Sequence, residues 1–280
     1  MSGTLFVVAT PIGNLEDVTL RALRVLREVD LIAAEDTRRT ARLLSQHGIS
    51  TPTLSFHQHN VRGRVPQLVA RLKGGSSVAL VTDAGTPGVS DPGVELVQAC
   101  IEARISVDPI PGVSAPLAAA IASGFPLTPL TIFGFVPSRS KDRTPWLSDI
   151  SKISHTLTFF ESPHRIAATM SEACTLFVDR PIVVGRELTK IHQEFIRGTA
   201  KELTNRFGGA RGEFTVVVGP QPIVKERVSV ADSVIATEVW QTTEMPGLSR
   251  RAAISAVAKK YRRSAREVYE IIENGKKDGV

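Results

Sequence analysis

The sequence predicts an α/β fold with two α/β domains and a small helical C-terminal module, on the basis of three observations. Over the first 110 residues, short β-branched runs alternate with longer amphipathic segments. This rhythm is typical of a mostly parallel sheet with helices on both faces. From about Gly112 some strands lie too close together for helical crossovers, which indicates a mixed second sheet. From about Ser229 the chain becomes basic and helical. We therefore place the domains at residues 1–111 and 112–222, and the module at residues 229–280.

The first domain is expected to alternate strands and helices in chain order. Leu20, Leu23 and Leu26 recur near helical spacing, and Gly48 is placed to end the second helix as a C-cap. The expected strands are residues 5–9, 31–34, 53–56, 77–81 and 105–110, and the expected helices are residues 20–29, 37–47, 61–73 and 94–103.

The second domain is expected to follow a different pattern. Strands are predicted over residues 131–135, 156–160, 182–185, 194–197 and 213–218, and helices over residues 114–123 and 165–176. Because residues 182–185 and 194–197 are so close in the chain, we expect them to pair antiparallel. Pro220 and Pro222 mark a linker after the last strand.

The C-terminal module is expected to contain two short helices. Ser249 is a candidate N-cap for the first, and the second should begin near Ser264 and end at Gly275. Between Leu248 and Arg266 there are seven Lys or Arg residues and no Asp or Glu. Such a module is either a helix-turn-helix-like element that binds nucleic acid or a solvated helical hairpin docked on the rest of the chain.

The composition sets broad limits on function. The chain has 280 residues, 42% hydrophobic and 22% charged, which is ordinary for a globular protein. Its apolar runs fall short of the roughly 20 residues of a membrane span, so no membrane partner is expected. Cys100 and Cys174 have no metal-ligand spacing, which favours a reducing cytoplasm and no metal site. The net charge of +6 is a mild indication of a polyanionic partner.

The strongest candidate for a binding site is the loop at residues 82–93, TDAGTPGVSDPG, which directly follows an apolar strand. Open α/β sheets bind ligands outside the carboxyl ends of their strands. Asp83 and Asp91 could accept hydrogen bonds from a ribose or an amine. Residues 8–14 and 111–115 bring two further turns to the same edge, and Ser114 could cap a helix, contact a ligand, or do both. Neither a GxGxxG nor a GxxxxGK[ST] motif is present, which argues against a dinucleotide or a nucleoside triphosphate.

Three strand ends each combine a carboxylate with a cation, at residues 34–40, 159–165 and 185–190. This pattern favours a polyanionic substrate whose phosphates pair with Arg or Lys. The alternative for the first is that Asp36 caps a helix while Arg38 and Arg39 remain solvated. His57 and His59 are interpreted as surface or packing residues.

Taken together, these motifs resemble the ribosomal small-subunit RNA methyltransferase I family, a branch of the tetrapyrrole (corrin/porphyrin) methylase superfamily. The resemblance covers about Leu5 to Pro220 and extends to the helical tail. The motifs that carry it are VATPIGN, AEDTRRT, TDAGTPGVSDPG, PGVSA, FFESPHR, GRELTK and RGEFTVVVGP. It implies transfer of a methyl group from S-adenosylmethionine to the ribose 2′-hydroxyl of a cytidine in the decoding region of small-subunit (16S) ribosomal RNA. It also implies a homodimer, with the cofactor held in the cleft between two α/β domains.

The resemblance also implies a set of cofactor-binding residues. Val113 departs from the family, which commonly has Pro there, and this should soften the turn without removing Ser114. The implied residues are Pro11, Asp83, Ala84, Gly85, Thr86, Val89, Ser114, Ala115, Phe160, Leu188, Glu213, Phe214 and Thr215.

The remaining expectations concern catalysis and RNA binding. A ribose hydroxyl must lose a proton to attack the methyl group, so we expect a general base among Glu35, Asp36, Glu161 and His164. Candidate contacts to the free RNA or the assembled small subunit are Arg38, Arg39, Arg165, Arg186, Lys190, Arg250, Arg251, Lys259, Lys260, Arg262 and Arg263. Two alternatives stay open: a methylase acting on a corrin or porphyrin carbon, and a non-catalytic RNA-binding ribosome factor.

Overall fold

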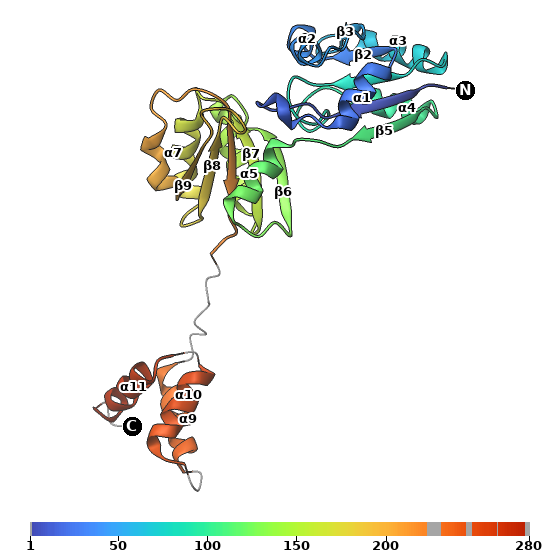
Figure 1. The fold of residues 1–280 in the computed structure, drawn as a ribbon. Coiled ribbons are helices and arrows are strands. Elements are labelled where there is room, and N and C mark those ends of the chain that lie inside the picture. The colour runs from blue at the N-terminus through green and yellow to red at the C-terminus, as the bar shows by residue number, and fades with distance from the viewer. Residues whose placement is uncertain (1, 223–230, 245–247, 262, 278–280) are drawn as a thin grey trace. The chain divides into compact units, whose positions relative to one another are not determined.

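The computed structural model describes residues 2–222, 231–244, 248–261 and 263–277. The chain divides into two compact units, Met1–Pro222 and Ile223–Val280. The first unit contains two five-stranded sheets, and the second is helical (Figure 1). The predicted α/β class with C-terminal helices is therefore confirmed.

The first sheet is parallel throughout and has the strand order β3-β2-β4-β1-β5. Helices α1 and α2 pack on one face through Leu23, Leu26 and Leu44, and helices α3 and α4 cover the other through Leu68 and Leu96. The strands are β1 (Thr4–Val8), β2 (Leu31–Ala34), β3 (Thr53–Ser55), β4 (Val78–Val81) and β5 (Ser106–Ile110). The helices are the short η1 (Leu15–Asp17), α1 (Leu20–Glu28), α2 (Thr37–Gln46), α3 (Val61–Lys73) and α4 (Val94–Glu102).

The second sheet is mixed, as expected, and has the order β6-β7-β10-β8-β9. Only β6 and β7 pair in parallel, and the close pair β8–β9 is antiparallel. The strands are β6 (Leu130–Phe135), β7 (Thr156–Glu161), β8 (Ile182–Arg186), β9 (Glu194–Gly198) and β10 (Phe214–Val218). The helices are α5 (Ala115–Ser123), α6 (Ser140–Ser151), α7 (Ile166–Leu176), α8 (Ala200–Leu203) and η2 (Thr204–Arg206). Helices α6 and α8 were not expected.

Arg180 fastens the end of the second sheet to neighbouring loops. Its side chain is almost completely buried. The guanidinium donates hydrogen bonds to the carbonyl oxygens of Gly219 (2.9 Å), Ile153 (2.8 Å) and His155 (2.9 Å). A buried cation without a carboxylate partner is stable only when carbonyl dipoles satisfy it, and these three carbonyls do so.

The C-terminal unit corrects the expectation of two helices. Its described residues form three: α9 (Asp232–Thr243), α10 (Arg250–Lys260) and α11 (Ala265–Lys277). Ser249 caps α10 as predicted, because its hydroxyl accepts a hydrogen bond from the amide of Ala252. Gly275 does not end α11, which continues through it. The core consists of Ile235, Val239, Ala253, Ile254, Val257, Ala258 and Val268. Across the described residues, we find no helix with the length and apolar character of a membrane span.

Candidate functional site

A cavity of about 360 Å³ lies in the first unit, at the carboxyl ends of β2 and β4 and against the second sheet. Its volume falls in the range of ordinary small-molecule sites. Both sheets contribute to its walls, so the pocket depends on the fold of the whole unit. It is lined by residues 83–86, 89–91, 114–116, 160–163 and 212–215, together with Ile12, Glu35, Arg39, Phe135 and Leu188.

The loop at residues 82–93 is fixed to both neighbouring turns. Gly85 and Thr10 exchange two backbone hydrogen bonds of 2.9 Å. Gly85 has a φ of 81°, a conformation that glycine adopts without strain. The hydroxyl of Thr86 donates to the carbonyl oxygen of Val113 at 3.2 Å. The three turns predicted at this edge are therefore joined into one wall of the pocket.

Carboxylates dominate the polar part of that wall. Asp83 Oδ1 accepts a hydrogen bond from the amide of Asp36 (3.0 Å), and Oδ2 lies 3.4 Å from Arg39 Nη1. Glu35 Oε2 in turn accepts a hydrogen bond from the amide of Asp83 at 3.2 Å. Burial raises the pKa of Glu35, although the hydrogen bond from the Asp83 amide opposes this shift. The pKa of Asp91 is raised to about 6, chiefly by burial and further by the nearby negative charges of Glu35 and Asp83.

The loop between β8 and β9 closes the opposite side. Leu188 lines the pocket between two non-glycine residues with left-handed backbones, Glu187 (φ 49°) and Thr189 (φ 65°). Such backbones cost free energy and persist only where several contacts impose them. Here the Thr189 amide donates to Gln193 Oε1 (2.7 Å), and its hydroxyl accepts from the Asn14 amide (3.0 Å). The loop is thus held against the first turn of the other sheet.

The structure brings most of the predicted cofactor residues together. Twelve of the thirteen line the pocket. Pro11 is not among the lining residues, whereas its neighbour Ile12 is. Asp91, expected as a hydrogen-bond acceptor of the binding loop, also lines the pocket, and the lining residues not expected at the site are Ser90, Pro116, Phe135, Ser162, Pro163 and Gly212. Ser90 lies within the predicted binding loop, so its position was the available signal. Phe135 had no such signal in the sequence, because only the fold brings it to the pocket.

The four candidate bases do not gather at one place. Glu35 and Glu161 line the pocket, whereas Asp36 and His164 do not. Asp36 caps α2 by accepting from the Arg38 amide at 2.9 Å and pairs with the Arg38 guanidinium at 2.8 Å. The hydrogen bonds from Arg38 hold the pKa of Asp36 well below its ordinary range. Asp36 therefore acts as the N-cap of α2, which is the alternative that the sequence left open for this residue.

Glu161 is held in place by its neighbours. Its side chain is completely buried. Its carboxylate accepts hydrogen bonds from the Ser162 amide (2.6 Å), Arg165 Nε (3.0 Å) and Thr169 Oγ1 (2.6 Å). With both oxygens occupied, Glu161 orients the start of α7.

The predicted phosphate-binding cations of this unit are also engaged, and only Arg39 lines the pocket. Arg186 Nε donates to the carbonyl oxygen of Arg211 at 2.9 Å. Lys190 lies 2.9 Å from Glu187 and 3.0 Å from Glu213. The three strand ends therefore neutralise much of their own charge locally.

In the C-terminal unit, acids from outside the basic stretch pair with several of its cations. Arg250 pairs with Glu273 at 2.9 Å, Arg263 pairs with Asp232 at 2.9 Å, and Lys260 pairs with Glu238. Arg251 and Lys259 are exposed on α10, and neither side chain makes a hydrogen bond or an ion pair within the described residues. Arg262 lies outside the described residues.

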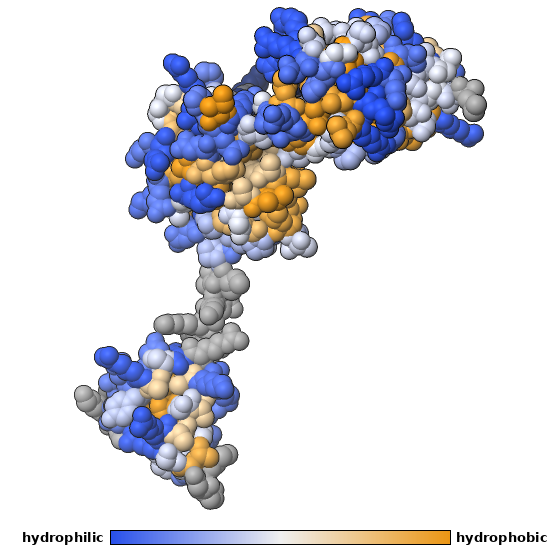
Figure 2. Space-filling model, viewed as in Figure 1, coloured by the Kyte–Doolittle hydropathy of each residue, from blue (hydrophilic) through white to orange (hydrophobic). Residues whose placement is uncertain are grey.

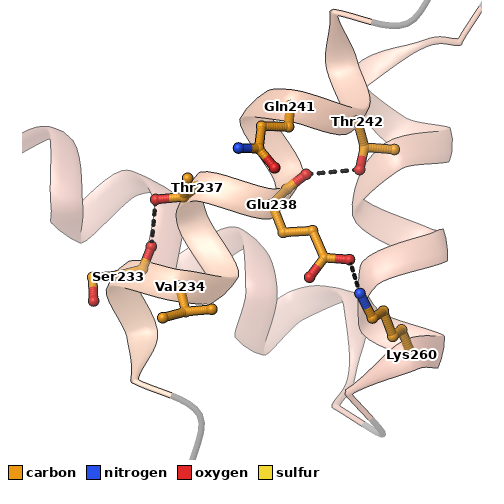
Figure 3. A pocket seen from close by; sticks show the side chains of 7 residues that line it. All are labelled: Ser233, Val234, Thr237, Glu238, Gln241, Thr242 and Lys260. Carbon is orange, nitrogen blue, oxygen red and sulfur yellow. Dashed lines mark hydrogen bonds and ion pairs between the residues drawn. The ribbon is translucent and has the colours of Figure 1, made fainter.

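A groove of about 600 Å³ runs along α9 and is closed by Lys260 (Figure 3). Its two threonine hydroxyls are already paired, since Thr237 donates to the carbonyl of Ser233 and Thr242 donates to that of Glu238. Lys260 points to Glu238 (Figure 3). Most of the polar groups of this groove are therefore engaged within the helices that line it.

Comparison with known proteins identifies the family. The family model described as Tetrapyrrole (Corrin/Porphyrin) Methylases matches residues 4–204. The chain is 42% identical over 281 residues to the ribosomal RNA small subunit methyltransferase I of Synechocystis sp., covering 99% of this chain and 100% of that protein. The chain belongs to this family. The member from Thermotoga maritima is 46% identical over 218 residues, which are 77% of this chain and 98% of that one.

Solved structures show the same fold at lower identity. A uroporphyrin-III C-methyl transferase from Thermus thermophilus, complexed with S-adenyl homocysteine, has a TM-score of 0.57 at 20% identity, over 78% of this chain and 97% of that one. The methyltransferase CobJ has a TM-score of 0.60 at 20% identity, over 78% and 95%. The chain therefore shares its two-sheet fold with these methyltransferases.

Proposed function

We propose that this protein transfers a methyl group from S-adenosylmethionine to the ribose 2′-hydroxyl of a cytidine in the decoding region of small-subunit ribosomal RNA. The names of its full-length relatives support methylation of small-subunit ribosomal RNA. The observation that carries the proposal is the acidic pocket, because its lining suits a cationic cofactor.

The residues present fit S-adenosylmethionine. Its sulfonium and ammonium groups are cationic, and the carboxylates of Glu35 and Asp83 face the same cavity. Ile12, Phe160 and Leu188 offer apolar surface for an adenine ring. When bound, S-adenosylmethionine supplies an already activated methyl group. The contribution of the chain is then to align the hydroxyl and to accept its proton.

The nucleotide is proposed to enter beside Phe135. This side chain is 59% exposed although it lines the pocket, and its ring lies 5.2 Å from that of Phe160. Exposed aromatic rings stack unpaired bases in many RNA-binding proteins. Phe135 thus offers a surface for the target base next to the proposed cofactor site.

We also propose a homodimer in the cytoplasm. Hydrophobic side chains gather over α5 and β6 (Figure 2). Ile121 is 71% exposed, and Leu117 and Ile132 are more than a third exposed. Exposed apolar patches of this kind mark protein–protein contacts. Size-exclusion chromatography with light scattering tests the dimer, and Ile121→Glu should shift it to a monomer.

The helical C-terminal unit is proposed to add RNA affinity and not chemistry. The Thermotoga maritima relative, matched over 98% of its length by 77% of this chain, has about the length of the first unit. It is also named ribosomal RNA small subunit methyltransferase I. Arg251 and Lys259 are the exposed cations of α10 available for phosphates.

The decisive experiment is transfer of labelled methyl from S-adenosylmethionine to purified, unmodified small subunits and to free ribosomal RNA, followed by nuclease mapping. Label on one cytidine ribose is expected. Absence of label with cofactor binding intact would contradict the proposal and favour a tetrapyrrole substrate or a non-catalytic role.

A further inference from the structure

Asp91 differs from the other carboxylates of the pocket because it makes no hydrogen bond or ion pair within the described residues. Both oxygens of Asp83 are engaged, by the Asp36 amide and by Arg39. Glu35 accepts from the Asp83 amide. Of the remaining two acids, Glu161 is held by Arg165 and Thr169. Glu213 pairs with Lys190. A carboxylate that faces a cavity without a partner has lone pairs available for a ligand.

The backbone around Asp91 places it where the two sheets meet. A Cβ added to Gly134 of β6 would lie 3.4 Å from the hydroxyl of Ser90, so the loop touches the second sheet one residue before Asp91. On the other side, Gly93 has a φ of 153° and packs so tightly that a Cβ would lie 3.0 Å from Leu80 Cδ2. Asp91 shares the pocket with the exposed ring of Phe135, the surface proposed for the target base.

We propose that Asp91 is the general base that accepts the proton of the attacking ribose hydroxyl, an inference that rests on the proposed function. In this step the bond from the ribose oxygen to the methyl carbon forms as the bond from carbon to sulfur breaks. The electron pair of the broken bond stays on sulfur, and the hydroxyl proton moves to the Asp91 carboxylate and then to solvent. Of the four expected bases, Asp36 is a helix cap, Glu161 is a buried anchor, His164 does not line the pocket, and Glu35 accepts a hydrogen bond from the Asp83 amide.

The electrostatic surroundings suit that role. Burial, with a further contribution from the negative charges of Glu35 and Asp83, raises the pKa of Asp91 to about 6. A base with a pKa close to the working pH is ionised yet basic enough to accept a proton. Asp91 must be ionised to act, so kcat/KM should rise with pH up to about 6 and then level off. The other charged side chains that line the pocket are Glu35, Asp83, Glu161, Glu213 and Arg39.

The test uses Asp91→Asn in the full chain, with Asp149→Asn as the matched control, because Asp149 is exposed on α6 and does not line the pocket. We expect kcat/KM of D91N to fall about 100-fold or more, the usual contribution of a positioned base. D149N should keep the wild-type rate. The Kd of S-adenosylhomocysteine, measured by calorimetry, should change less than threefold in D91N.

A second readout does not depend on activity. In unliganded protein with ¹³C-labelled aspartate carboxyls, the resonance that D91N lacks should titrate near pH 6. A normal titration near pH 4, or a D91N enzyme that keeps the wild-type rate, would overturn the inference. So would a loss of activity matched by an equal loss of cofactor affinity. A wild-type enzyme that methylates no RNA would instead contradict the proposed function, and the carboxyl titration would still be measurable.

Discussion

Gly13 is the position where one methyl group should disturb the whole pocket. It lies in the turn after β1 and packs against the loop between β8 and β9. A Cβ at Gly13 would lie 2.5 Å from Lys190 Cγ, 2.7 Å from Thr189 Oγ1 and 2.9 Å from the carbonyl oxygen of Leu188. The lysine stem can move aside, but the carbonyl of Leu188 belongs to the backbone. Gly13→Ala must therefore displace the loop that holds Leu188 in the pocket.

The size of the effect follows from these contacts. Overpacking of this kind costs about 1–3 kcal/mol. If the loop moves away, the 3.0 Å hydrogen bond from the Asn14 amide to Thr189 is also lost, which adds about 0.5–1.5 kcal/mol. Cofactor affinity should fall as well, since Leu188 lines the pocket. A tenfold rise in Kd, about 1.4 kcal/mol, is the expected order.

Urea unfolding and calorimetry with S-adenosylhomocysteine measure both effects. Gly63→Ala is the matched control, because nothing lies within 4 Å of a Cβ there and Gly63 is inside α3. It should gain about 0.5–1 kcal/mol and bind the cofactor as the wild type does. A G13A protein with unchanged stability and unchanged Kd would refute the idea that this contact shapes the pocket.

Three further outcomes are expected. Arg180→Lys should lower the free energy of unfolding by about 1.5–3 kcal/mol in urea, because an ammonium cannot satisfy the three carbonyls that the guanidinium reaches; wild-type stability would contradict this. Phe135→Ala should raise the KM for RNA by about tenfold, given about 1–3 kcal/mol per stacked base, and leave the Kd of S-adenosylhomocysteine unchanged. Replacing both Arg251 and Lys259 with Ala should reduce the slope of log K against log salt by about 1.5–2 in RNA-binding titrations; an unchanged slope would remove α10 from the interface.

Much of the fold could be predicted because the buried face of each element appears as a local pattern of apolar residues. The bounds of β2 (Leu31–Ala34) and α3 (Val61–Lys73) match the expectation residue for residue. In β2 all four side chains are buried, so the strand reads as a continuous apolar run. The missed helices lack such a signal. Helix α6 contains Pro145 and many polar residues, and it forms because Leu147 and Ile150 pack into the core of the second sheet.

The candidate site likewise has one part that could be predicted from the sequence and one part that could not. The turns after parallel strands could be assigned to one edge of the sheet because the topology of parallel sheets requires it. The partners of the charged residues could not be assigned, because they depend on distant contacts. Lys190 pairs with Glu213, 23 residues away, and Arg250 pairs with Glu273. Counting charges along the sequence therefore overestimates the positive charge available to RNA.

The charge of the pocket indicates that the proposed RNA affinity comes from other surfaces. Five carboxylates and one guanidinium line the cavity, an arrangement that attracts a cationic cofactor and repels a phosphate chain. The cations at the strand ends cannot reverse this, because their neighbours already engage Arg38, Arg165 and Lys190. Removal of residues 223–280 should accordingly leave cofactor binding nearly intact while weakening RNA binding and its salt dependence. Equal losses of both would mean that the C-terminal unit supports the fold, and that the acidic pocket receives its RNA by contacts within the first unit alone.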